Sequence, residues 1–85
     1  MNYRLYLDPG VHRTYMDLPE PVRSKLSRVL VDALVDPFAA TEPYGPFDDG
    51  VMRLWAAGDL ALVLMVGMET KTVTVLSISW AALEE

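Results

Sequence analysis

The seven residues from Leu60 to Val66 are all apolar, and this run constrains the fold more than any other feature of the chain. It lies between two turn signals, Gly58-Asp59 before it and residues 67–70 after it, so it predicts a short strand. A strand that is apolar at every position is typical of the centre of a sheet, covered on both faces. The flanking segments, 51–56 and 71–80, are expected to be its neighbouring strands.

The sequence pattern of the N-terminal half predicts one strand and two helices. Residues 3–7 alternate as a strand, and a first helix is expected from about 9 to 18. Pro19 ends this helix, because the residue before a proline is pushed out of the helical region. A second helix is expected over 20–36, and residues 38–50, rich in proline and glycine, are expected to be a loop. The second helix carries one apolar stripe at helical spacing, formed by Val22, Leu26, Val29, Leu30, Ala33 and Leu34.

The predicted element order is therefore β-α-α-β-β-β. We expect an α+β fold in which an antiparallel sheet is covered on one face by a helical hairpin. Eighty-five residues are enough for one such domain, spanning 1–85, and too few for two. Strict alternation in the last strand places Val73 and Val75 on one face, and on the other Thr72, Thr74, Leu76, Ile78 and Trp80.

Composition excludes several kinds of site. The chain has no cysteine and a single histidine, His12, so we expect no metal site and no cofactor. Seven basic residues against twelve acidic ones give a net charge of −5, which disfavours binding to RNA or the ribosome because phosphate binding depends on Lys and Arg. The N-terminal residues lack the pattern of a secretory signal, and no apolar run is long enough to span a bilayer as a helix. We therefore expect a cytoplasmic protein with no membrane contact.

Few side chains are candidates for chemistry. If the even-numbered residues of the strand 51–56 pack under the helices, Arg53 and Trp55 face solvent together, where they could anchor a phosphate or a carboxylate. The alternative is an arginine that covers the sheet with its aliphatic stem. Histidine is the side chain suited to proton transfer near neutrality, although His12 also fits a solvated helix end. Tyr44 could stack on a base or a partner, or pack over the edge of the core.

One face of the apolar middle strand has no predicted cover, because the chain supplies a single layer of helices. The residues that face away are expected to be Ala61, Val63 and Met65, or alternatively Leu60, Leu62, Leu64 and Val66. A large apolar patch left in water is unusual for a monomer and indicates an interaction surface. We expect a partner polypeptide or a second copy of the chain to bind there, with Trp55 and Trp80 contributing.

This pattern resembles the RelE/ParE superfamily of type II toxins over residues 3 to about 80. The matching segments are YRLYLDPGV, LVDPF, PYG, MRLWAAGDLALVLMV and VTVLSIS. The family shares a basic and apolar strand, a Gly-Asp turn and an apolar strand, which Arg53 and Gly58-Asp59 match. The resemblance implies the β-α-α-β-β-β fold and the toxin component of a toxin–antitoxin module. Its implied partners are a cognate antitoxin and a target such as gyrase.

The chain departs from the ribonuclease members of that family. Those members resemble one another in carrying lysines on the second strand, an arginine early in the third and a basic residue after the last. In this chain the second of those strands has Arg53 as its one basic residue. The position of the arginine in the third strand falls near Ala61, and the basic position after the last strand falls near Trp80-Ala81, so neither is basic. Since RNA cleavage needs cations that stabilise the developing charge, we expect action mainly by protein binding, without efficient ribonuclease activity. The alternative is an mRNA interferase, an endoribonuclease, with a displaced site built from Arg53, His12 and either Tyr44 or Arg13.

Overall fold

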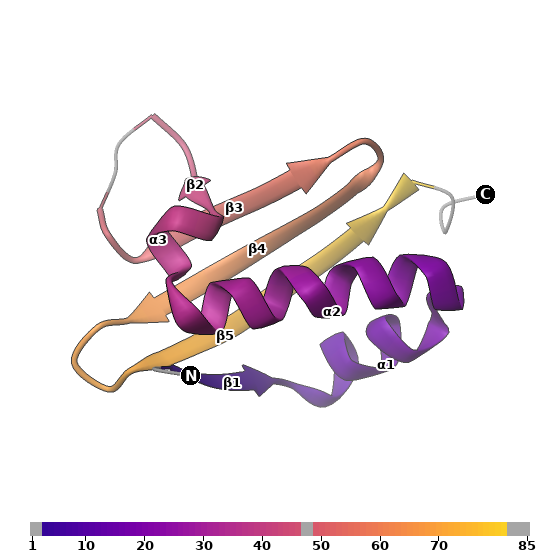
Figure 1. Cartoon of the computed structure of the whole chain (residues 1–85), viewed down its shortest axis with the longest axis horizontal. Helices are drawn as coiled ribbons and strands as arrows, with labels where there is room; N and C mark the ends of the chain where they lie inside the picture. The colour runs from indigo at the N-terminus through magenta and orange to yellow at the C-terminus, as the bar shows by residue number, and fades with distance from the viewer. Residues whose placement is uncertain (1–2, 47–48, 82–85) are drawn as a thin grey trace.

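The computed structural model describes residues 3–46 and 49–81 as a sheet with helices packed on one side (Figure 1). All six predicted elements are present, and their bounds lie within two residues of those expected. The elements are β1 (Arg4–Leu7), α1 (Pro9–Asp17), α2 (Glu20–Val35), α3 (Pro37–Ala40), β2 (Glu42–Pro43), β3 (Met52–Ala57), β4 (Leu60–Gly67) and β5 (Thr72–Trp80). The short α3 and β2 fall in and beside the segment that the sequence predicts to be a loop.

Local sequence explains where the helices begin and end. The Asp8 carboxylate accepts a hydrogen bond of 2.7 Å from the backbone N–H of Val11, and thereby caps α1, whose first residue is a proline. Leu18, directly before Pro19, is extended and ends α1 as expected. The predicted apolar stripe of α2 is confirmed, because its buried residues are Leu26, Leu30, Ala33 and Leu34.

The sheet is mixed, which corrects the antiparallel sheet expected from the sequence. Its strand order is β1-β5-β4-β3-β2, and β1 runs parallel to β5 while the other neighbours are antiparallel. Alternation within a strand determines which residues share a face, but it carries no information on the direction of a neighbour that is distant in sequence. The hairpin of β3 and β4 is closed at Gly58, whose φ of 62° suits a residue without a side chain.

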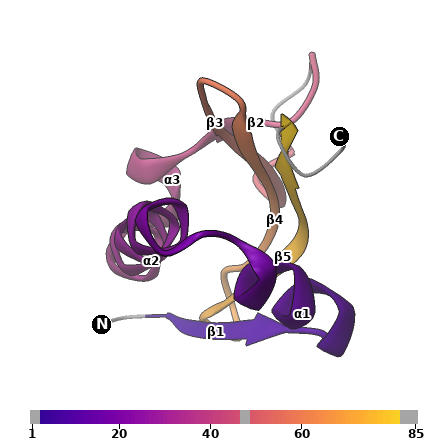
Figure 2. The same cartoon turned by 90° about the vertical axis from the view of Figure 1, so that its right-hand side faces the viewer.

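The core lies between α1, α2 and one face of the sheet. Figure 2 shows α2 over that face. Leu60, Leu62, Leu64 and Val66 are buried on the helix side, so Ala61, Val63 and Met65 are the residues of β4 that face away. This decides between the two alternatives left open by the sequence. The remaining buried members of the core are Val11, Leu18, Leu26, Leu30, Leu34, Val73 and Val75.

A β-bulge interrupts the alternation of β5. Leu64 pairs with Val75 while Val63 pairs with Ser77, so Leu76 is an extra residue on β5. Beyond the bulge, Ile78 and Trp80 pack against the same core as Val73 and Val75. The expectation that they lie on the opposite face from the two valines is therefore wrong. Within the described residues, none of the helices has the length and apolar character needed to cross a membrane.

Candidate functional site

The face of the sheet turned away from α1 and α2, called the open face below, is the most extensive uncovered apolar surface of the sheet. Met65 on the central strand is 40% exposed, and Val63 and Ala61 are half-buried. The open face is formed by Arg4, Tyr6, Met52, Leu54, Ala56, Ala61, Val63, Met65, Thr72, Thr74, Leu76, Ser77 and Ser79.

Strand register arranges the open face in rows across the sheet. One row crosses four strands and consists of Tyr6, Thr74, Met65 and Met52. A second row joins Ser77, Val63 and Leu54, and a third joins Ser79, Ala61 and Ala56. The third row is flat because its side chains are small, so a partner backbone can approach the sheet closely there. The first two rows offer flexible methionines and branched chains, which adapt to an apolar partner.

The open face carries no cation on β3 or β4. Arg53 is the one basic residue of β3 and β4, and it lies on the other face. The exposed Arg4 lies on the open face only at its β1 edge, so β3 and β4 have no group there that could neutralise a phosphate or stabilise a developing negative charge. The chemistry of the open face suits an apolar segment of a polypeptide.

Arg53 is buried rather than solvent-facing, which corrects the orientation expected from the sequence. Its side chain is 4% exposed, and it donates hydrogen bonds of 2.9 Å and 3.3 Å from Nη2 to the carbonyl oxygens of Thr41 and Phe38. Its Nε donates to Thr41 Oγ1 over 3.0 Å, and the guanidinium lies 5.1 Å from the centre of the Phe38 ring. The acceptors come from α3 and the residue after it, so no pattern around Arg53 itself could have located them.

Trp55 and Trp80 also lie on the helix side, so the expected solvent-facing position of Trp55 is wrong, whereas Trp80 fits the interpretation of a core residue. Both are partly buried and pack against the core. Trp55 lines a cleft between α2 and α3, and the Nζ of Lys25 lies 6.0 Å from the centre of its ring. The predicted contribution of the two indoles to partner binding stays a prediction.

The four residues of the predicted displaced catalytic site do not meet. His12 and Arg13 are exposed on α1, which packs against β1 and β5. Tyr44 is 49% exposed and follows β2, at the opposite edge of the sheet. Arg53 is buried beneath α3. Tyr44 and Arg53 come from neighbouring segments, since Pro43 pairs with Arg53 and the Tyr44 N–H donates to the Met52 carbonyl oxygen. The guanidinium of Arg53 is nevertheless held under α3, and α1 with His12 and Arg13 packs at the other edge of the sheet.

Asp49 has a structural role at the entrance to β3. Its Oδ1 accepts hydrogen bonds of 2.9 Å from the backbone N–H groups of Val51 and Met52. The hydrogen bond from Met52, followed by that from Val51, lowers the pKa of the Asp49 carboxyl from its ordinary value of 3.8. Among residues 3–46 and 49–81, no cluster of three metal-ligating side chains occurs.

No protein-family model and no curated protein sequence matches the chain. Solved structures of RelE toxins do match it. The isolated RelE toxin of E. coli is 27% identical, with a TM-score of 0.76 over 93% of this chain and 84% of that one. A chain of the intact E. coli RelBE toxin–antitoxin complex is also 27% identical, with a TM-score of 0.75 over 93% and 96% of the two chains. A chain of the RelBE2 complex from Mycobacterium tuberculosis is 17% identical, with a TM-score of 0.77 over 94% and 99%.

These likenesses define the class of the molecule as a small α+β protein with the fold of RelE toxins. The resemblance predicted from the sequence segments is thereby confirmed, and the chain is a RelE/ParE-like protein.

Proposed function

We propose that this protein is the toxin component of a toxin–antitoxin pair and that its open face binds the antitoxin polypeptide. The similarity to solved structures supports this proposal, because matching chains from E. coli and M. tuberculosis come from toxin–antitoxin complexes. The support from this chain is the open face itself, where Met65, Val63 and Leu54 leave an apolar patch on a small domain. The apolar character of the open face is the observation that carries the proposal.

We further propose that the protein acts by binding rather than by cleaving RNA. The open face has no cation on β3 or β4, and the net charge of the chain is −5. Removing one charge-stabilising donor from an active site costs about 10²–10³ in rate, so a site without several of them has little catalytic power. A protein target such as gyrase fits this mode of action.

The partner is tested by co-expression with the product of the adjacent gene. We expect the two chains to co-purify and the yield of soluble protein to rise. In the variant Met65→Lys a charge enters the apolar patch, and we expect co-purification to fall by about tenfold or more, because an unpaired charge is costly to bury. Met16→Lys is the matched control, since Met16 is 53% exposed on α1, away from the open face. Equal co-purification of both variants would overturn the proposal.

The mode of action is tested by incubating the purified chain with ribosomes and messenger RNA. We expect the message to stay intact while induced expression arrests growth, and a gyrase supercoiling assay then examines the protein target. Cleavage that disappears in His12→Ala or Tyr44→Phe would instead support the mRNA interferase. These two exposed residues are better probes than Arg53, because replacing a buried arginine also perturbs the fold.

A further inference from the structure

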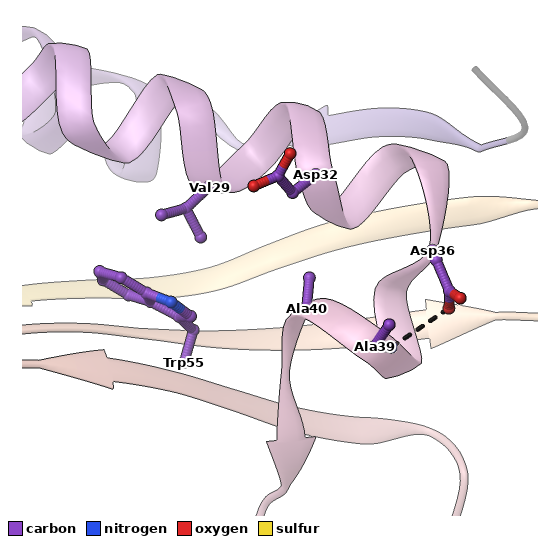
Figure 3. Close-up of a pocket in the computed structure, with 6 residues that line it drawn as sticks. All are labelled: Val29, Asp32, Asp36, Ala39, Ala40 and Trp55. Carbon is purple, nitrogen blue, oxygen red and sulfur yellow. Dashed lines mark hydrogen bonds between the residues drawn. The ribbon is translucent and has the colours of Figure 1, made fainter.

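A second candidate site lies on the helix side of the sheet, away from the open face. It is a cleft of about 280 Å³ between α2, α3 and β3 (Figure 3). The indole of Trp55 forms one wall, and α3 closes one end with two small side chains, Ala39 and Ala40. α2 contributes Val29 and Asp32, and Asp36 lies at the junction of α2 and α3.

One of the two carboxylates of this cleft, that of Asp32, conflicts with the local preferences of a helix. Asp32 lies in the last turn of α2, where the helix dipole disfavours negative charge, and Asp36 is the extended residue between α2 and α3. No basic residue occupies the last turn of α2 to offset the charge of Asp32. A charge that the helix disfavours needs a reason outside the helix.

Capping explains one of these carboxylates and leaves the other unexplained. Asp36 Oδ1 accepts hydrogen bonds of 3.2 Å from the backbone N–H groups of Phe38 and Ala39, and so caps α3. The Asp32 carboxylate has neither a hydrogen bond nor an ion pair within the described part of the chain, although Arg28 lies one turn before it on α2. Asp32 is exposed and lies at the cleft.

The aromatic wall suits a cation. The face of an indole attracts positive charge, and the Nζ of Lys25 already lies 6.0 Å from the centre of the Trp55 ring. A guanidinium group fits such a cleft better than an ammonium group, because it is planar, stacks on an aromatic ring and donates two parallel hydrogen bonds to a carboxylate. The methyl side chains of Ala39 and Ala40 leave room for a flat group at the end formed by α3.

We propose that this cleft binds a guanidinium group, stacked on Trp55 and paired with the carboxylate of Asp32. The group is either the side chain of an arginine in another polypeptide or a small guanidinium compound. The inference is independent of the proposed function, since the cleft and the open face lie on opposite sides of the sheet.

The probes are N-acetyl-arginine methylamide, agmatine and an Ala-Arg-Ala peptide with blocked ends, titrated at constant ionic strength. The readout is the indole N–H resonance of Trp55, assigned by comparison with Trp80→Phe. We expect saturable shifts with a Kd on the order of 1–10 mM for a single side-chain contact. Saturation by all three probes supports a site open to small compounds, and saturation by the peptide alone supports recognition of a protein arginine.

Two variants test the assignment of residues. Asp32→Asn removes the charge from an exposed position and should weaken binding by about tenfold, whereas Asp17→Asn, at the end of α1, should leave the Kd unchanged within twofold. Ala39→Leu fills the cleft without changing any charge and should abolish saturation. Equal binding of N-acetyl-lysine methylamide, unsaturable shifts, or an Asp32→Asn variant that binds like the original chain would each overturn the proposal.

Discussion

At the scale of single residues, Arg53 is the position where the chain departs most from a simple reading of its sequence. A charge inside a core is tolerated only where hydrogen bonds replace its hydration. Arg53 has such bonds, because α3 and Thr41 direct two carbonyl oxygens and one hydroxyl oxygen at its guanidinium. We infer that Arg53 fastens α3 and β2 to the sheet.

Replacing Arg53 with methionine should therefore destabilise the protein. The carbonyl oxygens of Phe38 and Thr41 would lose their donor, which costs about 1–3 kcal/mol of unfolding free energy for a buried group. Arg13→Met, on the exposed surface of α1, is the control and should change stability by less than about 0.5 kcal/mol. Urea unfolding followed by circular dichroism measures both, and equal midpoints would contradict the assigned role.

Asp49 makes the stability of the turn before β3 depend on pH. The pKa of Asp49 is lower in the folded state than in the unfolded state. The ionised carboxylate therefore stabilises the fold at a pH above its unfolded pKa, and this contribution is lost as the pH falls through its folded pKa. A carboxyl titration by NMR should give Asp49 a midpoint below 3.8. Below that pH the difference in stability between the original chain and Asp49→Asn should shrink. A midpoint at or above 3.8 would show that the two backbone hydrogen bonds are weak in solution.

At the scale of elements, the bulge in β5 determines which side chains reach the core. If Leu76 were paired regularly, without a bulge, a strand of period two could bury either Val75 or Ile78 and Trp80, but not all three. The bulge lets all three pack on the helix side. Both neighbours at the bulge, Leu76 and Ser77, are exposed.

Two single-residue deletions in β5, one at the bulge and one in its regular part, test the assigned register. Deleting Leu76 should preserve the fold, since Val75 and Ser77 then alternate regularly and every core residue keeps its face. Deleting Thr74 should be far more harmful, because a one-residue shift turns Val73 away from the core, and burying such a side chain is worth about 1.5–3 kcal/mol. Urea unfolding ranks the two deletions, and a Leu76 deletion as damaging as the Thr74 deletion would contradict the register described above.

At the scale of the whole molecule, charge and surface chemistry point to the same kind of partner. The chain carries a net charge of −5, and its largest uncovered sheet surface is apolar and without cations on β3 and β4. The negative net charge disfavours phosphate, and the exposed apolar surface favours an apolar polypeptide. Self-association through the open face and a cytoplasmic location stay predictions.

RNA binding by the isolated chain should consequently be weak. We expect a Kd above about 10⁻⁴ M at physiological salt, at the weak limit of non-specific binding. A variant with Ala56→Lys, Ala61→Arg and Ser79→Lys, which adds three cations in one row of the open face, should bind more tightly, with a slope of log K against log salt of about −2. Filter binding at several salt concentrations measures both proteins. Micromolar binding by the original chain would contradict the expected role of charge.

Much of the fold could be predicted because its signals are local. The apolar stripe of α2, the prolines that bound the helices and the Gly-Asp turn each act within a few residues. The open face was predicted only as one of two alternatives, because the run 60–66 is apolar on both sides. The position of Arg53 was predicted wrongly for a related reason: its hydrogen-bond acceptors are brought to it by α3, which the sequence does not separate from a loop.

The sequence by itself determined the order of the six main elements, the lack of cysteine and the negative net charge, since each follows from residue identity or from short-range periodicity. Only the tertiary structure decided that β1 runs parallel to β5, that a bulge returns Ile78 and Trp80 to the core, and that Trp55 forms a cleft with Asp32. Those features depend on contacts between residues far apart in the chain. A one-dimensional pattern specifies which groups must be buried, but the partner of each group is selected when the whole chain packs.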